Sequence, residues 1–261
     1  MNIYWMEQRE ADVPADNHWL SAKEILFLSG LRFAKRHTDW RLGRWTAKRL
    51  LADCLHLRTH PSNLANLEIL AASSGAPEVF LFNQTPDVTI SLSHRAGRAI
   101  AVVALRKTTL GCDLEVVEPR SPAFVSDYFT HNEQTLIEKT CSEKRTLLIT
   151  LCWSAKESAL KAMREGLRLD TRCVEVFPGD GLFSKRFEEM QTSASHINPD
   201  PAVWHPLRVR SEAGQVFEGC WRHTNQFVET VVVSLKNSAS LITDVELEHS
   251  HRDARLHQLS A

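Results

Sequence analysis

The chain of 261 residues lacks the features that would assign it to several specialised classes of protein. Its six cysteines are scattered and form no Cys-x-x-Cys pair. A structural zinc site or a disulfide framework is therefore not expected. No apolar run approaches the roughly eighteen residues that a membrane-spanning helix needs. The N-terminal residues do not pair a basic segment with an apolar one, so no signal peptide is expected and a cytoplasmic location is favoured.

A large net charge of either sign is also missing. The sequence has 31 Lys and Arg against 32 Asp and Glu, which leaves a formal charge of -1 at pH 7. Such a balance does not attract a polyanion or an anionic membrane to the whole protein. We therefore expect neither nucleic acid nor membrane as a partner. The hydrophobic content of 43% is ordinary for a globular protein, and the length allows one large domain or two small ones.

The periodicity of apolar residues predicts helices followed by strands in both halves of the chain. Because these elements do not alternate as strand, helix and strand, the pattern favours an α+β fold. Ser21 and Glu24 are spaced as a capping box, and so are Thr130 and Glu133. The helices are expected at 21–29, 31–57 with an interruption or bend near Gly43, 133–139 and 143–164. The strands are expected at 1–10, 79–82, 88–92, 99–105, 110–117, 172–177, 206–210, 216–221 and 226–235.

Three connecting segments carry further predictions. Residues 61–76 are expected to be irregular, apart from the apolar stretch 67–72. Residues 106–109 are expected to form the turn of a hairpin between the strands at 99–105 and 110–117. The polar, His-rich residues 239–261 are expected to form a loosely held tail.

Two carboxylates lie two residues apart near the end of an apolar strand. Asp113 and Glu115 occur in Gly-Cys-Asp-Leu-Glu, residues 111–115. The alternation of side chains along a strand places both on one face. Like charges at this spacing repel, and burying them is costly unless a cation lies between them. An exposed sheet edge is the ordinary explanation of such a pair, but the apolar neighbours favour a buried strand.

A second charged pair follows about forty residues later. Glu157 and Lys161 lie four residues apart in a predicted helix, so they share a face. By itself, such a pair is most often a surface ion pair of small energetic value. Together with Asp113 and Glu115, Glu157 would complete a site for a hard cation such as Mg²⁺, which prefers oxygen ligands and acts on phosphate substrates.

The segment 32–49 is strongly basic. It contains seven Lys or Arg residues and one acid, Asp39, with Trp40 and Trp45 between them. Arg41, Arg44 and Lys48 fall on one helical face. A solvated face is one explanation of this pattern. A nucleic-acid-binding surface that contacts phosphates and stacks bases is another, although the balanced overall charge argues against it.

Three motifs in order resemble those of the 4′-phosphopantetheinyl transferases. They are Ser91-x-Ser93-His94-x-x-Gly97, Gly111-x-Asp113-x-Glu115, and Trp153-Ser154-x-Lys156-Glu157-x-x-x-Lys161. The segments Gly43-Arg44-Trp45 and Phe129-Thr130-x-x-Glu133 also match the family pattern. The length points to the large, surfactin-synthetase-activating type, and the resemblance runs from about residue 1 to 235.

This resemblance implies a reaction and a fold. The phosphopantetheine arm of coenzyme A would move to a serine of an apo acyl- or peptidyl-carrier protein, releasing adenosine 3′,5′-bisphosphate. The resemblance implies two similar α/β subdomains in a pseudo-dimeric arrangement, with the active site in the cleft between them. The first would span residues 1–110 on the nucleotide side of coenzyme A, and the second 111–238. The large type is expected to be a monomer.

The resemblance also implies roles for individual residues. Asp113, Glu115 and Glu157 would hold Mg²⁺ or Mn²⁺, and Glu157 would also take the proton of the serine. Lys161 would stabilise charge on the phosphates, and Lys156 would contact the pyrophosphate or shape its helix. The coenzyme A contacts would come from Arg36, Arg44, Ser93, His94, Lys156 and Lys161. The catalytic set would be Glu157, Lys161 and Asp113.

The chain departs from the family pattern at one position. The family often has Gly-Lys-Pro where this chain has Gly75-Ala76-Pro77, so a cation near coenzyme A is missing. Phe124, Phe129 and Leu136 are a hypothesis for docking of the carrier protein.

Three different functions compete with the transferase. A Mg²⁺-dependent phosphohydrolase would use the same acids with water as the nucleophile. A nucleic-acid-binding module would use the basic segment 32–49. A non-catalytic scaffold would keep only the fold, and the retention of Asp113, Glu115 and Glu157 disfavours it.

Overall fold

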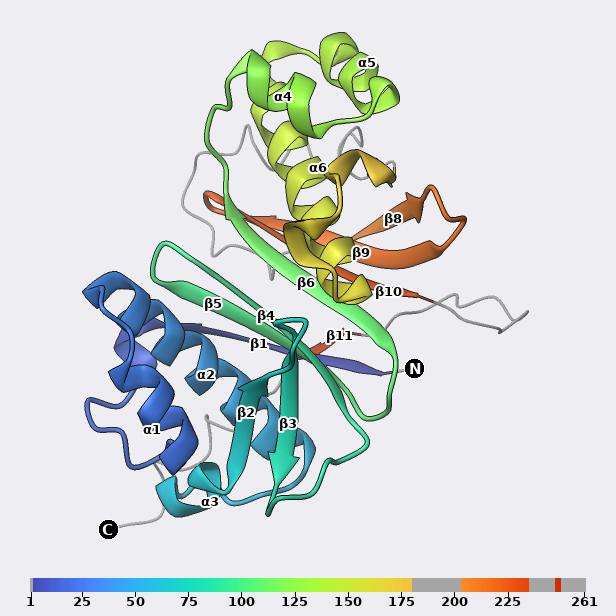
Figure 1. The fold of residues 1–261 in the computed structure, drawn as a ribbon. Coiled ribbons are helices and arrows are strands. Elements are labelled where there is room, and N and C mark those ends of the chain that lie inside the picture. The colour runs from blue at the N-terminus through green and yellow to red at the C-terminus, as the bar shows by residue number, and fades with distance from the viewer. Residues whose placement is uncertain (1, 180–202, 235–246, 250–261) are drawn as a thin grey trace. The chain divides into compact units, whose positions relative to one another are not determined.

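The computed structural model describes residues 2–179, 203–234 and 247–249, and the chain divides into two compact units (Figure 1). Unit 1 consists of residues 1–108 with 242–261, and unit 2 of residues 109–241. Each unit contains helices and a mainly antiparallel sheet. The α+β class predicted from the sequence is confirmed.

Unit 1 is built on a four-stranded sheet in the order β11-β1-β5-β4. The strands β1, β5 and β4 are antiparallel neighbours, whereas β11 pairs in parallel with β1. A separate antiparallel hairpin is formed by β2 and β3. The strands are β1 (Ile3–Arg9), β2 (Leu67–Ala71), β3 (Pro77–Leu81), β4 (Thr89–Arg95), β5 (Arg98–Ala104) and β11 (Leu247–His249). The helices are α1 (Ala22–Ser29), α2 (Ala34–Cys54), α3 (Pro61–Ala65) and the short 3₁₀ helix η1 (Glu10–Asp12).

Unit 2 is built on a five-stranded antiparallel sheet in the order β6-β10-β9-β8-β7. The long helix α6 covers one face of this sheet (Figure 1). The strands are β6 (Thr109–Val116), β7 (Val174–Phe177), β8 (His205–Ser211), β9 (Val216–Thr224) and β10 (Phe227–Ser234). The helices are α4 (Pro122–Tyr128), α5 (His131–Lys139), α6 (Ser142–Met163), η2 (Gly166–Arg168) and η3 (Thr171–Cys173).

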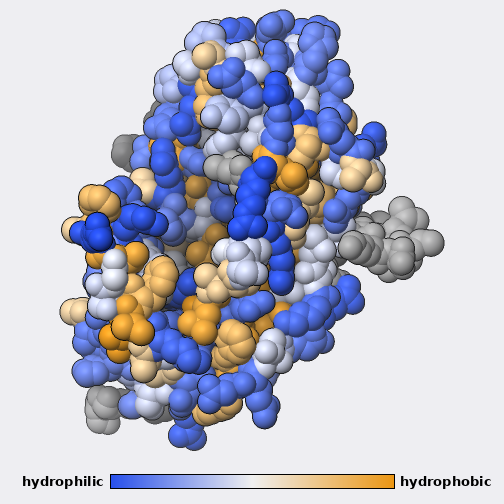
Figure 2. Space-filling model, in the orientation of Figure 1, coloured by the Kyte–Doolittle hydropathy of each residue, from blue (hydrophilic) through white to orange (hydrophobic). Residues whose placement is uncertain are grey.

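Each unit has a core between its long helix and its sheet. In unit 1, Leu50 and Leu51 of α2 pack with Met6, Ala101 and Val103. In unit 2, the corresponding core contains α6 residues and the β8, β9 and β10 side chains that face them. Burial of these apolar side chains is the main stabilising contribution. The face shown in Figure 2 is largely hydrophilic with hydrophobic residues interspersed, as expected when most large apolar side chains belong to the cores.

The two units repeat one chain order. In unit 1, β1 is followed by helices, the β2 and β3 strands, and then β4 and β5, with β5 lying between β1 and β4. In unit 2, β6 is followed by helices, β7 and β8, and then β9 and β10, with β10 lying between β6 and β9. The predicted similarity of the two halves is therefore visible in their topology.

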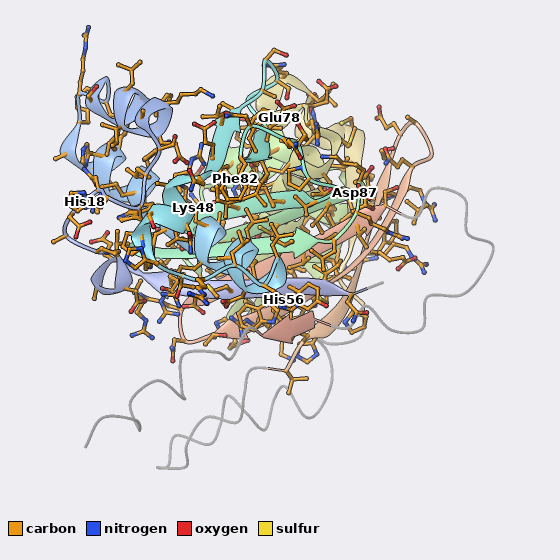
Figure 3. All side chains as sticks on the ribbon, turned by 90° about the horizontal axis from the view of Figure 1, so that it is seen from below. His18, Lys48, His56, Glu78, Phe82 and Asp87 are labelled. Atoms are coloured by element: carbon orange, nitrogen blue, oxygen red, sulfur yellow. The ribbon has the colours of Figure 1, made fainter. Side chains whose placement is uncertain are left out.

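Each unit contains an equivalent buried ion pair between a lysine of its long helix and a glutamate that caps a shorter helix. In unit 1, Lys48 of α2 (labelled in Figure 3) lies 2.5 Å from Glu24, which forms a capping box with Ser21 at the start of α1. In unit 2, Lys156 of α6 lies 2.8 Å from Glu133, which forms a capping box at the start of α5. Each glutamate also accepts a strand amide, from Ile69 in the first case and Val176 in the second.

Several local predictions are corrected. Helix α2 runs without interruption through Gly43, and residues 61–65 form α3 rather than an irregular segment. The apolar stretch that was excepted from that segment contains β2. Strands β5 and β6 do not form a hairpin, because both edges of β5 are occupied by β1 and β4 while β6 pairs with β10. Within the expected tail, residues 247–249 pair with β1, and residues 239–246 and 250–261 lie outside the described residues.

Candidate active site

Strand β6 carries the first two predicted acids toward helix α6. Lys161 Nζ of α6 lies 2.6 Å from Asp113 Oδ1, and Trp153 Nε1 of α6 donates to Glu115 Oε1 over 3.2 Å. Since both carboxylates contact the same helix, the predicted alternation of β6 is correct. The side chain of Asp113 is 5% exposed and that of Lys161 28%, so their ion pair is only partly screened by solvent.

Helix α6 approaches β6 closely because residue 111 is glycine. A Cβ atom at Gly111 would lie 1.9 Å from the carbonyl oxygen of Ser158 and 2.9 Å from the amide nitrogen of Ala162. Both contacts are with backbone atoms, which cannot rotate away. Gly111 therefore sets the distance between the strand that carries Asp113 and the helix that carries Lys161.

We expect Gly111→Ala to lower the free energy of unfolding by about 3 kcal/mol or more, because a well-packed backbone would have to move. Gly30→Ala is the matched control. Its φ of -81° is ordinary, and its Cβ would meet only Phe27 O at 3.4 Å. Urea unfolding of both variants is the measurement. A cost at Gly111 no larger than that at Gly30 would contradict the close approach.

Glu157 lies beside the Lys161–Asp113 pair. Burial is the main cause that raises the pKa of Glu157 to about 7; Lys161 opposes the rise, and the negative charges of Asp113 and Glu115 support it. Burial alone would lower the pKa of Lys161, but the negative charge of Asp113 raises this pKa above its ordinary value. Among the described residues, none forms a hydrogen bond with the buried Oε1 atom of Glu157. The site thus contains a carboxyl group that can exchange a proton near neutral pH.

Glu115 is held from two sides. Besides Trp153, Arg120 approaches it, with Nη2 at 3.5 Å from Glu115 Oε2 and 3.2 Å from Glu118. The guanidinium also lies over the ring of Phe124. Arg120 was not among the predicted site residues, because an arginine in a Pro-flanked loop carries no motif. Its place next to Glu115 is a finding of the structure.

The donor set suits a hard cation. Asp113, Glu115 and Glu157 supply only carboxylate oxygens, and the buried Glu157 Oε1 atom is available as a ligand. In the part of the chain that the structure describes, no three His, Cys, Asp or Glu side chains are close enough to form a ready-made metal site. Lys161 and Arg120 instead neutralise Asp113 and Glu115. The residues fit a Mg²⁺-type ion chemically, and the assignment of all three as ligands stays a prediction.

Lys156 does not face a substrate. Its side chain is fully buried, and its ammonium donates to Glu133, to the Thr171 carbonyl at 3.0 Å and to the Val174 carbonyl at 2.5 Å. These three acceptors use all three of its N–H groups. The structure therefore corrects the assignment of Lys156 to the coenzyme A contacts and supports the second prediction, that Lys156 shapes its helix.

In unit 1, the end of strand β4 carries Ser93 and His94. Ser93 is buried and His94 is exposed. A Cβ at Gly43 of α2 would lie 3.2 Å from Leu92 and 3.6 Å from the His94 ring. Glycine therefore lets α2 pass close to the imidazole, which explains a residue that the sequence suggested as a helix interruption. His94 therefore lies next to Gly43, the residue before Arg44.

The basic segment does not form one continuous cationic face. Lys48 is buried with Glu24, and Arg41 donates to the backbone carbonyls of Pro14 and Asp16. Arg44 lies over the ring of Trp40 at 5.0 Å, and burial lowers its pKa although Glu24 opposes this. Arg36 is exposed on α2. Of the three cations predicted to share a face, two are used inside the fold, which disfavours a nucleic-acid-binding helix.

The hypothesis for carrier docking needs one correction. Phe129 is fully buried in the core of unit 2 and cannot contact a partner. Phe124 is half-buried in an aromatic cluster with Tyr128 and Trp153, at centroid distances of 4.9 and 5.0 Å. Tyr128 is 40% exposed and was not predicted. Leu136 is half-buried on α5.

The repeated fold shows which unit carries the acids. Trp45 Nε1 donates to Gln8 Oε1 at 3.2 Å in unit 1, as Trp153 donates to Glu115 in unit 2. Residues 45–48 read Trp-Thr-Ala-Lys and residues 153–156 read Trp-Ser-Ala-Lys. On this basis Met6, Gln8 and Arg49 occupy the positions of Asp113, Glu115 and Glu157. Unit 1 keeps the supporting ion pair but none of the three acids.

Comparisons with known proteins give one match to a family. Residues 109–203 match the sequence model of the 4′-phosphopantetheinyl transferase superfamily. Among solved structures, the chain is similar to a holo-(acyl-carrier-protein) synthase from Bacillus anthracis, solved in complex with CoA (3′,5′-ADP). That similarity has 19% identity and a TM-score of 0.33, and it covers 39% of this chain and 91% of the other. No curated protein matches the chain.

The match to the superfamily includes both acidic motifs. Asp113 and Glu115 lie near its start, and Glu157 and Lys161 lie in its middle. Within the described residues, no helix is long and apolar enough to cross a membrane. The segment that carries Asp113, Glu115, Glu157 and Lys161 is thus similar in sequence to the 4′-phosphopantetheinyl transferases.

Proposed function

We propose that this protein transfers the 4′-phosphopantetheine arm of coenzyme A to a serine of an apo acyl- or peptidyl-carrier protein. The other product is adenosine 3′,5′-bisphosphate. The observation that carries the proposal is the grouping of Asp113, Glu157 and Lys161 by β6 and α6, inside the segment that matches the superfamily. We further propose the large, surfactin-synthetase-activating type, a monomer of two similar units, in the cytoplasm.

The proposed chemistry uses the groups of unit 2. Asp113, Glu115 and Glu157 would hold Mg²⁺, which when bound supplies positive charge to the pyrophosphate of coenzyme A. The serine hydroxyl forms a bond to the β-phosphorus as the bond to the bridging oxygen breaks. Glu157 accepts the serine proton, a role that its raised pKa supports. Lys161, which is partly exposed beside Asp113, stabilises the charge on the leaving phosphate.

Unit 1 is proposed to bind the nucleotide end of coenzyme A. His94 is exposed at the end of β4, and Arg36 is exposed on α2. Their exposure supports a role for both side chains in contacting an anion. Ser93 and the half-buried Arg44 complete the proposed set. Ala76 lies in the turn between β2 and β3, where the family often has a lysine, so these residues must supply the positive charge without it.

The experiment that tests this function is the intact mass of a carrier protein. Purified protein is incubated with coenzyme A, Mg²⁺ and an apo carrier, with Asp113→Asn and Glu157→Gln as controls. We expect a gain of about 340 Da on the carrier that both substitutions abolish. Hydrolysis of coenzyme A without a gain of mass would instead favour the phosphohydrolase. No reaction with carriers from fatty acid, polyketide and peptide synthesis would reject the proposal.

Replacement of His94 tests the nucleotide end separately. We expect His94→Ala to raise the Michaelis constant for coenzyme A about tenfold, because one charge-assisted contact to a phosphate is lost. The Michaelis constant for the carrier protein should stay the same. His56→Ala, at an exposed turn after α2, is the control and should change neither constant. A loss of maximal rate without a change in either constant would place His94 outside the nucleotide contacts.

A further inference from the structure

Three buried hydroxyl groups join α6 to the central strand of unit 2. Thr230 Oγ1 of β10 lies 2.9 Å from Ser154 Oγ and 2.7 Å from Ser158 Oγ. Ser158 also donates to the backbone carbonyl of Thr230 over 3.2 Å. All three side chains are fully buried. Hydroxyl groups are costly to bury unless they are hydrogen-bonded, and here they satisfy one another.

This hydroxyl cluster lies directly beneath the candidate active site. Thr230 pairs with Asp113 across the β6–β10 ladder. Ser158 follows Glu157 in sequence and lies less than one turn before Lys161. The carbonyl of Ser158 is also the group that Gly111 of β6 approaches most closely. The cluster therefore connects the strand next to Asp113 with the turn of α6 that carries Glu157 and Lys161.

The other unit provides an internal comparison. Leu50 of α2 occupies the position of Ser158, and Ala101, which pairs with Met6, occupies that of Thr230. Both are fully buried in an apolar core. Thr46, in the position of Ser154, donates within its own helix to the Leu42 carbonyl. The same helix-on-sheet packing thus forms in unit 1 without hydroxyl groups that join helix to sheet.

The comparison of the two units shows that packing of the helix on the sheet does not require the hydroxyl groups found in unit 2. Apolar contacts allow small sliding movements, whereas hydrogen bonds between fixed donors and acceptors define one register. The unit that lacks the acids has the apolar version, and the unit that carries them has the hydroxyl version. The hydroxyl groups therefore serve something that only unit 2 does.

We propose that Ser158 and Thr230 are positioning residues that hold the α6 turn of Glu157 and Lys161 in register with Asp113. The importance of this register for catalysis rests on the proposed function. The positions of α6 and β6 relative to each other can be tested without it. Metal affinity commonly falls by about 10–100-fold when residues that orient the ligands are replaced. The hydroxyl groups of the cluster contact one another and the backbone carbonyl of Thr230, so their proposed effect on Glu157 and Lys161 acts through the position of α6.

The experiment uses the full chain with Thr230→Val, which keeps the shape and removes the hydroxyl, and Thr230→Ser, which restores it. Binding of Mn²⁺ is measured by electron paramagnetic resonance without coenzyme A or carrier. In parallel, Lys161→Met is introduced into each background, and its effect on the unfolding equilibrium constant is measured. We expect Thr230→Val to weaken Mn²⁺ binding about tenfold and Thr230→Ser to restore it. Lys161→Met should raise the unfolding equilibrium constant about tenfold in the wild-type background. In the Thr230→Val background, its effect on the free energy of unfolding should be less than half of that in the wild type.

Thr46→Val in unit 1 is the matched control, since it also removes a buried hydroxyl from the equivalent helix. It should leave both readouts as in the wild type. If Thr230→Val lowers stability but leaves Mn²⁺ binding and the effect of Lys161→Met unchanged, the cluster is only structural and the proposal is rejected. If the wild type binds no Mn²⁺, the Lys161 readout alone decides. If both readouts shift as expected but no carrier is modified, the positioning role stands and the proposed function fails.

Discussion

Glu157→Gln should abolish phosphopantetheine transfer and, in the metal-free protein, increase stability at alkaline pH. The first effect follows from the loss of a proposed metal ligand and proton acceptor. General base catalysis alone contributes about 10²–10⁴-fold to a reaction rate. Because a metal ligand is lost as well, we expect the rate of phosphopantetheine transfer to fall by about a thousandfold or more. The second effect follows from the pKa of Glu157, which burial raises to about 7 from an ordinary 4.5.

The sign of the stability effect can be derived from proton binding. Between pH 4.5 and 7, the folded state holds a proton on Glu157 more often than the unfolded state does. Stability therefore falls as the pH rises through this window, because the folded protein must ionise a buried carboxyl group. Glutamine does not ionise. The variant should gain about 1 to 2 kcal/mol relative to wild type at pH 8, a value reduced for solvent screening of the partly exposed side chain.

The measurement is urea unfolding of both proteins at pH 5 and pH 8 with EDTA present. The difference between variant and wild type should be small at pH 5 and favour the variant at pH 8. Glu165→Gln is the control, since Glu165 is exposed just beyond the end of α6. It should leave the transfer rate within about twofold. An equal difference for Glu157→Gln at both pH values would mean that its carboxyl group ionises in the folded protein as it does in the unfolded chain.

The sequence was sufficient for the residues whose pattern is local. Alternation along 110–117 correctly placed Asp113 and Glu115 on one face, and the spacing of Ser21 with Glu24 and of Thr130 with Glu133 correctly predicted two capping boxes. These features depend on strand or helix periodicity and on contacts between residues three apart. Such contacts are encoded within a few neighbouring positions.

The sequence was insufficient where distant segments decide the outcome. Lys156 has the spacing of a site residue, but its partner Glu133 and the carbonyls of Thr171 and Val174 come from other elements. Gly43 was interpreted as a helix interruption, whereas it admits the His94 ring from β4. The hairpin expected between β5 and β6 failed because strand pairing depends on which edges other strands already occupy. The repeat of the two units leaves short traces in the sequence, Trp-Thr/Ser-Ala-Lys and the two capping boxes that contain Glu24 and Glu133.

Lys156→Met should cause a large loss of stability, because it leaves the buried carboxylate of Glu133 without its cation. Lys156 and Glu133 have side-chain exposures of 0% and 1%. Removing one partner of such a pair typically costs about 3–5 kcal/mol. The backbone amides of Thr130 and Val176 still donate to Glu133, so the loss should fall in the lower part of that range. Urea unfolding at pH 7 is the measurement.

The double variant Lys156→Met/Glu133→Gln separates the pair from its surroundings. With no charge left buried, it should be more stable than the sum of the single losses predicts, by about 1–3 kcal/mol. Lys48→Met in unit 1 is the parallel variant, since Lys48 pairs with a buried glutamate, Glu24, and also donates to two backbone carbonyls. Additive losses would show that Lys156 and Glu133 act independently. At a temperature where Lys156→Met stays folded, its Michaelis constant for coenzyme A should equal that of wild type. A large increase would instead return Lys156 to the substrate contacts that its motif suggested.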